Sequence, residues 1–269
     1  MAWINGTIVE SFAQVVAIRP DGECEQPLEA TLFDLKESSS VSESLFDLSR
    51  LFPMGGRVRC LMNDCGNAQF SFTSRLVQRN YAGPKVVKVE PIDEPADATL
   101  ARECHISQAY GTIIWANDIG EGEVNVANHG KVKFLQYATM PDSECKPRYE
   151  LMRLTELMPA HRSVLVRLYM GGPVNADVII ASVEPMGKLY TGEGVITEVK
   201  ERCAVIMSYS FGEIFMPLSS FRCREWTRDA DERDRVLSHL VGLKVRFTIS
   251  HSIPTKPTKW RAIRVESLL

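Results

Sequence analysis

Short runs of alternating apolar and polar residues recur along the chain in the same order three times. Each series opens with a glycine and a β-branched run, at residues 6–9, 111–114 and 194–197. A second run follows at residues 15–18, 124–126 and 204–207, and a third at residues 30–33, 131–134 and 213–216. Alternation with a period of two residues is typical of half-buried strands. Each third of the chain is therefore predicted to begin with an antiparallel meander.

A segment with apolar residues three and four positions apart follows each meander, at residues 45–52, 151–158 and 236–241. This spacing predicts an amphipathic helix. A fourth strand comes next and is centred on Val58, Leu165 and Val245 in the three copies. The distance from the opening glycine to this central residue is 52, 54 and 51 residues, respectively. Such a constant distance indicates an internal repeat.

A fifth strand is predicted at residues 176–183 in the second copy and 260–265 in the third. In the first copy, residues 74–78 and residues 85–89 both fit. Five strands with a helix between the third and fourth form the order of the OB fold, a small Greek-key barrel. We therefore expect a mainly β protein with three tandem five-stranded OB-like barrels, each with a short helix between strands 3 and 4. A sandwich or Tudor-like barrels would share the strand count but would not need the helix.

These repeats suggest domain boundaries. The first barrel is placed at residues 1–80 and the second at 108–187, with the third at 188–269. Residues 81–107 between the first two contain three prolines and several acids, which is typical of a linker, with room for an extra edge strand. The joint between the second and third barrels is only residues 185–191, so those two barrels are expected to pack on each other.

Length and composition fit this architecture. The 269 residues are 45% hydrophobic and 24% charged, as in ordinary folded protein. The sequence has no apolar run of membrane-spanning length and no signal-like N-terminus, so we expect a protein of the cytoplasm or nucleus without a membrane partner. The seven cysteines are scattered and lack paired zinc-site spacing, so we expect reduced thiols, with no metal and no cofactor.

Charge is divided unequally along the chain. Residues 1–100 hold 9 Lys and Arg against 14 Asp and Glu, and residues 101–187 hold 8 against 10. Residues 188–269 hold 14 against 10, a net charge of +4 in a chain whose overall net charge is −3. The basic excess thus lies entirely in the third copy, which is therefore the best candidate for contact with nucleic-acid phosphates.

Residues 212–221, G-E-I-F-M-P-L-S-S-F, give the third copy a resemblance to the cold-shock family of OB domains. Phe215, the Ser219-Ser220 turn and Phe221 match the family's third strand. The resemblance implies an OB barrel that binds single strands by base stacking. The second strand, residues 202–207, lacks the family's aromatic residues, and Pro217 replaces its third-strand histidine. The first and second copies match the family in strand order alone.

Aromatic and basic residues are interleaved in the third copy, as in barrels that stack bases and follow the phosphates. The predicted nucleic-acid-binding residues are Phe215, Phe221, Arg222, Arg224, Trp226, Lys256, Lys259, Trp260 and Arg261. Among them, Phe215, Trp226 and Trp260 would stack bases, and the basic residues would neutralise phosphates. Trp226 and Trp260 fit equally well as caps on the barrel core.

The sequence has none of the common nucleophile, phosphate-loop or metalloprotease motifs, and its five histidines fall singly in different elements. We therefore expect no catalytic residues and no enzyme activity. The hypothesis is an intracellular protein that binds RNA or single-stranded DNA, mainly through the third barrel. The alternative is a non-catalytic scaffold or adaptor with protein partners in a ribonucleoprotein assembly, because a barrel that has lost its stacking aromatics can serve protein contact instead.

Overall fold

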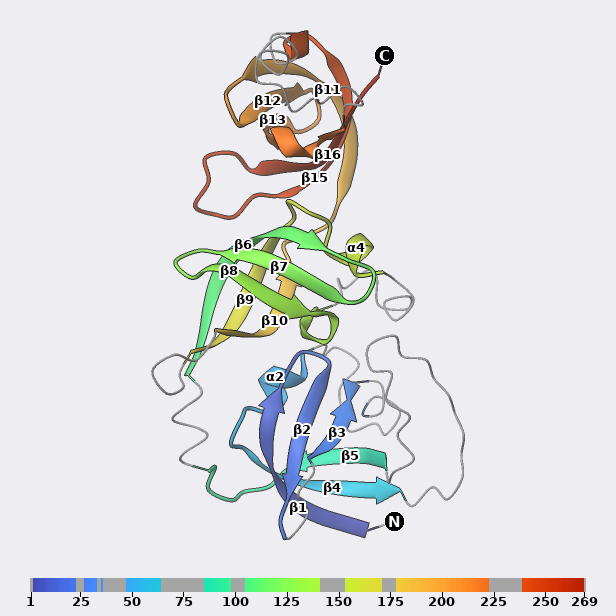
Figure 1. The fold of residues 1–269 in the computed structure, drawn as a ribbon, viewed down its shortest axis with the longest axis vertical. Coiled ribbons are helices and arrows are strands. Elements are labelled where there is room, and N and C mark those ends of the chain that lie inside the picture. Colours follow the sequence, from blue (N-terminus) through green and yellow to red (C-terminus); the bar gives the residue numbers. More distant parts are fainter. Residues whose placement is uncertain are drawn as a thin grey trace.

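The computed structural model describes residues 2–22, 27–32, 35, 47–63, 85–97, 105–140, 153–170, 178–222 and 239–268. These residues form three consecutive sheets stacked along the long axis of the molecule (Figure 1). We refer to the three sheets with their helices as units 1, 2 and 3. Units 1 and 2 are half-barrels and unit 3 is a closed barrel. The predicted fold class, mainly β with OB-like sheets in tandem, is confirmed.

Unit 1 has the strand order β3-β2-β1-β4-β5. Its elements are β1 (Ala2–Ser11), β2 (Val15–Pro20), β3 (Leu28–Thr31), α2 (Leu48–Leu51), β4 (Arg57–Asn63) and β5 (Lys85–Pro91). Because β5 pairs with β4, the fifth strand is the later of the two predicted segments. Residues 74–78 lie outside the described residues. The sheet of unit 1 therefore runs past residue 80, where we expected the first barrel to end, into the predicted linker.

Unit 2 repeats this order as β10-β9-β6-β7-β8. Its elements are β6 (His105–Ala116), β7 (Glu121–Val126), β8 (Gly130–Leu135), the 3-10 helix η1 (Gln136–Ala138), α4 (Leu154–Leu157), β9 (Ser163–Met170) and β10 (Ile179–Pro185). A parallel bridge between Thr139 and Val183 links the ends of its third and fifth strand regions. The first strand begins at His105, three residues before the predicted start of the second barrel.

Unit 3 has the order β13-β12-β11-β15-β16-β14, and a further pairing of β13 with β16 closes the barrel. Its elements are β11 (Tyr190–Val199), β12 (Cys203–Ser208), β13 (Gly212–Pro217), the 3-10 helix η3 (Leu218–Ser220), β14 (Phe221–Arg222), β15 (Lys244–His251) and β16 (Trp260–Ser267). The β13–β16 pairing is parallel, as expected between the third and fifth strands of an OB barrel. His239 and Leu240 are helical, and the rest of the predicted third helix lies outside the described residues.

The opening glycines of the three units sit where a side chain has no room. A Cβ atom on Gly194 would lie 2.6 Å from the carbonyl oxygen of Met207 and 2.8 Å from Cγ2 of Ile206. A Cβ atom on Gly6 or Gly111 would meet its second strand at 2.7 Å. Every other residue type would force the first two strands apart, so the repeated glycine has a steric cause.

A β-bulge follows two residues after each of these glycines. The register of the first strand against the second shifts after Ile8 in unit 1, after Ile113 in unit 2 and after Ile196 in unit 3. The three isoleucines are at most 1% exposed and belong to three separate hydrophobic cores. A bulge at this point increases the bend of the strand, which gives each short sheet its curvature.

The turn before the fourth strand is also repeated. In each unit its backbone exchanges hydrogen bonds with the buried isoleucine of the first strand. A residue with positive φ occupies this turn in all three units: Gly55 at 81°, His161 at 71° and Gly242 at 85°. Glycine adopts this conformation without cost, whereas a residue with a side chain loses about 1–2 kcal/mol. His161 is thus the exception in the repeat.

Units 1 and 2 are joined by polar contacts between residues far apart in sequence. The Tyr169 hydroxyl donates to the Ser11 carbonyl oxygen at 2.6 Å, and both groups are buried. Asp47, which caps α2 and is 1% exposed, accepts a bond from Arg167 at 3.2 Å. These contacts hold the two half-barrels against each other, although we expected only a linker between them. No helix in the described ranges is long and apolar enough to cross a membrane.

The joint between units 2 and 3 consists of Met186 and the residues up to Tyr190, where β11 begins. The Met186 amide donates to the Ser163 carbonyl oxygen at 3.0 Å. The guanidinium of Arg162, which is 3% exposed, donates to the Gly187 carbonyl oxygen at 2.9 Å. The joint is therefore fixed to unit 2 by its backbone, and in Figure 1 the loop between β15 and β16 extends from unit 3 toward unit 2.

Candidate nucleic-acid interface

The outer face of β12 and β13 is the first part of the candidate site, because the corresponding strands of OB folds bind oligonucleotides. Alternation along β12 buries Ala204 and Ile206 and turns Val205 and Met207 outward. Val205 pairs with Phe215 on β13, whose side chain is half-buried on the same face. The face is therefore apolar at its centre, with one ring accessible for stacking.

Arg261 lies directly beside this ring. The parallel pairing of β13 with β16 places Arg261 opposite Phe215, and its guanidinium carbon lies 5.1 Å from the ring centroid. Its Nε atom is buried and has no hydrogen-bond partner among the described residues. Burial lowers the pKa of Arg261, but an arginine stays charged at neutral pH. A cation is thus held on the apolar face, beside the ring.

The other cations of unit 3 divide into two groups. Four of them form ion pairs with carboxylates: Lys200 with Glu198, Arg202 with Glu201, Arg246 with Glu193, and Arg264 with Glu266. Within the described part of unit 3, five cations have no such ion pair: Arg222, Lys244, Lys256, Lys259 and Arg261. Four of these five are residues that the sequence nominates, and an unpaired cation can bind a phosphate without first losing a carboxylate.

The loop between β15 and β16 is the second part of the candidate site. It carries the exposed Lys256 and Lys259. The loop has its own backbone hydrogen bonds, from the Ser252 amide to the Lys259 carbonyl oxygen at 2.8 Å and from the Lys256 amide to the Ile253 carbonyl oxygen at 3.0 Å. Both lysines are therefore presented by an ordered loop next to the start of β16.

Trp260 and Phe221 do not have the exposure that base stacking needs. Trp260 is 9% exposed and Phe221 is 5% exposed, and both belong to the core of unit 3. Of the two roles that fit Trp260, the structure supports the core cap and is at odds with stacking. Phe221 is buried because β14 pairs with β16 and turns this side chain inward, while the next residue, Arg222, is exposed. Arg224 and Trp226 lie outside the described residues.

An aromatic cluster that sequence reasoning did not identify surrounds Trp260. His251 stacks on the indole at 4.4 Å with an interplanar angle of 20°, and Tyr190 and Phe211 each contact it edge-on at 5.3 Å. The amine of Lys259 lies 5.0 Å from the same ring. His251 continues the inward alternation of Phe247 and Ile249 along β15, a pattern that could have nominated it.

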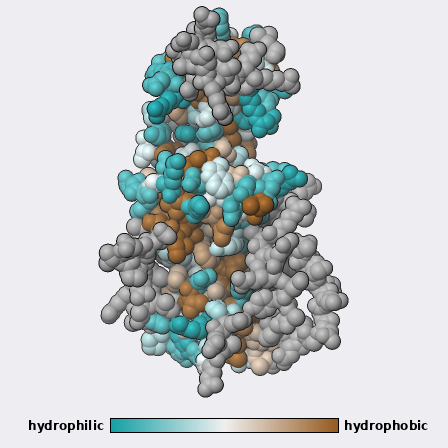
Figure 2. Space-filling model, in the orientation of Figure 1, coloured by the Kyte–Doolittle hydropathy of each residue, from teal (hydrophilic) through white to brown (hydrophobic). Residues whose placement is uncertain are grey.

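Unit 2 offers less on the equivalent face. Phe134 is 3% exposed and belongs to the core of unit 2, so this ring is structural. Lys131 and Lys133 are exposed on β8, and Lys133 pairs in register with Glu123. On the side of the molecule drawn in Figure 2, the described surface of unit 3 is largely hydrophilic, whereas hydrophobic patches lie over the lower two units.

No protein-family model and no curated protein matches the sequence. Among solved structures, the chain is similar to the Drosophila Unr CSD456 structure, with 13% identity over 100% of this chain and 98% of that one and a TM-score of 0.26. It is also similar to a multidomain protein with nucleic acid binding domains from Streptococcus pneumoniae, with 10% identity over 97% of this chain and 72% of that one and a TM-score of 0.20. At such TM-scores, neither likeness supports a statement about what this chain binds.

Proposed function

We propose that this protein binds single-stranded nucleic acid, RNA or DNA, through unit 3. The observation that carries the proposal is the position of Arg261 over Phe215, on the strand face that OB folds use for oligonucleotides. The ring gives a surface for one base, and the guanidinium beside it attracts a phosphate. Each stacked base contributes roughly 1–3 kcal/mol in proteins of this kind.

The unpaired cations extend this site in two directions. Arg222 is exposed on β14, beyond the end of η3, while Lys256 and Lys259 lie on the loop that precedes β16. A strand that crosses the β12–β13 face would meet the lysines near the start of β16 and Arg222 near its end, because β14 pairs with β16 at Val265 and Glu266. Stacking on the Phe215 ring needs an unpaired base, which favours a single strand over a duplex.

Fluorescence anisotropy with a labelled 12-nucleotide single strand and the matching duplex tests the proposal. We expect the single strand to bind more tightly than the duplex. Phe215→Leu should weaken single-strand binding by about tenfold, since it removes the stacking surface while it keeps an apolar side chain. Tyr110→Leu, at a ring 36% exposed on unit 2, is the matched control and should leave the affinity unchanged. Equal losses in the two variants would count against a site on unit 3.

A second candidate function is protein contact through unit 1, as in a scaffold or adaptor of a ribonucleoprotein assembly. It is favoured by Trp3, which is 45% exposed and lies under the guanidinium of Arg59 at 4.8 Å. Aromatic residues and arginine are enriched at protein interfaces. Co-purification with and without nuclease separates the two functions: partners that persist after nuclease treatment would support the scaffold, and partners that disappear would support tethering by nucleic acid.

A further inference from the structure

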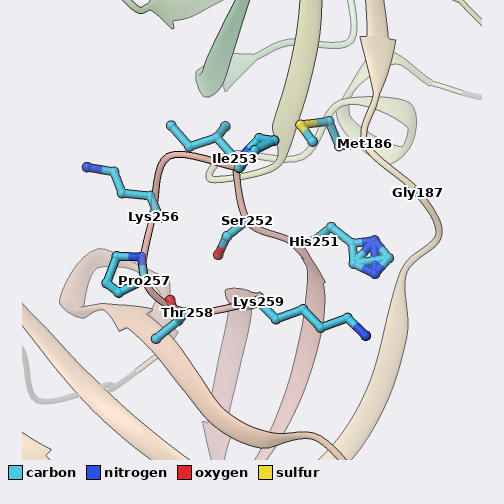
Figure 3. Close-up of a pocket in the computed structure, with 10 residues that line it drawn as sticks. Met186, Gly187, His251, Ser252, Ile253, Lys256, Pro257, Thr258 and Lys259 are labelled. Atoms are coloured by element: carbon cyan, nitrogen blue, oxygen red, sulfur yellow. The ribbon is translucent and has the colours of Figure 1, made fainter.

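A pocket of about 420 Å³ lies where the joint between units 2 and 3 meets the β15–β16 loop (Figure 3). Met186 and Gly187 of the joint form one side, and residues 251–254 and 256–259 form the other. Its volume falls within the range of about 300–1,000 Å³ that is usual for small-molecule sites. The pocket is open to solvent, and both loop lysines are among the residues that line it.

The charged residues that line the pocket are all basic. None of the residues that line the pocket is acidic, whereas two lysines, one histidine and the hydroxyls of Ser252 and Thr258 are among them. Met186, Ile253 and two prolines supply apolar surface. Apolar walls together with cations and neutral hydrogen-bonding groups suit a flat heterocycle that carries a phosphate.

The side chains of the two lysines leave opposite sides of the loop that lines this pocket. In Figure 3 the side chain of Lys256 leaves the loop on one side, and that of Lys259 leaves it on the other, below His251. A nucleotide within a strand has a phosphate on each side of it, whereas a free nucleoside monophosphate has only one. Two separated cations therefore fit a nucleotide inside a strand.

The histidine in the lining contributes a neutral ring. Burial and the neighbouring Lys259 keep the pKa of His251 below its usual value of 6.5, so the imidazole is uncharged at neutral pH. A neutral imidazole has one donor and one acceptor nitrogen. It can therefore hydrogen-bond a base edge, while the two lysines provide the positive charge.

We infer that this pocket receives one nucleotide of a bound single strand, with the flanking phosphates on Lys256 and Lys259. The inference rests on the proposed function, since it places one part of the same strand. It extends the site from unit 3 to the joint, because the Met186 amide donates to the Ser163 carbonyl oxygen and the Gly187 carbonyl oxygen accepts from the Arg162 guanidinium, both in unit 2. The pocket therefore exists only while units 2 and 3 are docked, and strand binding should stabilise that docking.

Gly187 provides a test that touches neither lysine. Its φ is +67°, and a Cβ atom there would lie 2.8 Å from Nδ1 of His251. Gly187→Ala would thus displace the His251 ring from the pocket wall. Gly242→Ala is the matched control, because Gly242 has a φ of +85° with nothing within 4 Å and lies at the other end of β15. Both variants place an alanine at a positive φ, but only the first changes the pocket.

The experiment measures the affinity of the full chain for a labelled 12-nucleotide oligouridylate by fluorescence anisotropy. We expect Gly187→Ala to bind at least fivefold more weakly than Gly242→Ala, and Gly242→Ala to stay within twofold of the unaltered protein. The double variant Lys256→Gln and Lys259→Gln should bring the slope of log Kobs against log salt closer to zero by about 1.4, or about 0.7 for each lost phosphate contact. Equal affinities of the two glycine variants would overturn the inference.

Crosslinking of the unaltered protein supplies a readout that does not depend on how the variants fold. A strand containing 4-thiouridine should crosslink to the peptide that contains residues 252–259, and crosslinks confined to β12 and β13 would overturn the inference. Uridine monophosphate should compete with the strand only in the millimolar range; competition in the micromolar range would show that the pocket serves a free nucleotide instead. If the oligouridylate does not bind at all, the proposed function itself fails. If it binds and Gly187→Ala leaves the affinity unchanged, only the inference about the pocket fails.

Discussion

Nε2 of His161 in unit 2 lies 3.2 Å from Oγ of Ser219 in unit 3, across the joint. His161 occupies the turn position at which units 1 and 3 have glycine, and its φ of 71° is costly for a residue with a side chain. The contact with unit 3 offsets part of that cost. Arg261, the cation on the strand face, is close enough to lower the pKa of His161. A charge in the candidate interface therefore acts on a titratable group at the joint.

The first prediction concerns pH. Burial, and to a smaller extent Arg261, keep the pKa of His161 below its usual 6.5 in the folded protein. The unfolded chain therefore binds more protons between the two pKa values, and stability rises with pH in that window. The contribution of His161 is complete above pH 6.5 and is lost as the pH falls below it. We expect the urea midpoint to decrease between pH 7.5 and pH 5.5, partly because of this residue.

His161→Asn isolates that effect, because asparagine tolerates positive φ and does not titrate. The variant should lose less stability on acidification than the unaltered protein, by an amount that cannot exceed about 1.4 kcal/mol per pH unit. Urea denaturation at the two pH values checks it. If both proteins lose the same stability, His161 does not couple to pH.

The second prediction separates core from surface around Trp260. Trp260→Ala should destabilise the protein by about 3–5 kcal/mol, because the indole fills the core of unit 3 and contacts three other rings. Lys259→Gln removes the neighbouring exposed amine and should leave the melting temperature within 1–2 °C, at about 0.5 kcal/mol or less. Thermal melts of the two variants check this. A small effect of Trp260→Ala would mean that the ring is not a core residue.

The third prediction tests the steric cause of the repeated glycine. Gly194→Ala should cost about 2–3 kcal/mol, since its Cβ atom would lie 2.6 Å from the carbonyl oxygen of Met207. Gly6→Ala and Gly111→Ala should behave alike in their own units, whereas Gly242→Ala should cost about 1 kcal/mol through backbone strain alone. Urea denaturation of the four variants checks the order. An equal loss of stability in all four variants would mean that close packing does not explain the repeated glycine.

Much of the fold was predictable because the repeat has local causes. The opening glycine and the buried isoleucine lie two residues apart, and the fourth strand follows the glycine at a nearly constant distance, so each copy shows these features in the same order. The end of unit 1 was harder to predict from the sequence. A long segment precedes β5, and only its pairing with β4 distinguishes β5 from residues 74–78 as the fifth strand.

The basic residues of the candidate site could be predicted from the sequence, whereas the exposure of its aromatic rings could not. Exposed basic residues without acidic neighbours, such as Lys256 and Lys259, can be recognised from the local charge. Whether an aromatic residue points in or out depends on strand register. Phe215 on β13 stays on the outer face, whereas Phe221, which follows the 3-10 helix η3, points inward from β14. Alternation along β15 points His251 inward, but its stacking on Trp260 depends on the pairing of β15 with β16, which the local sequence does not show.

The salt dependence of single-strand binding tests the central claim most directly. If Arg222, Lys256, Lys259 and Arg261 each contact a phosphate, the slope of log Kobs against log salt should be about −2.8, or about −0.7 per contact. Arg261→Gln should bring the slope closer to zero by about 0.7, and Lys244→Gln, at the far end of β15, should leave it unchanged. A slope near zero, or an equal change in the two variants, would contradict a phosphate-binding face on unit 3.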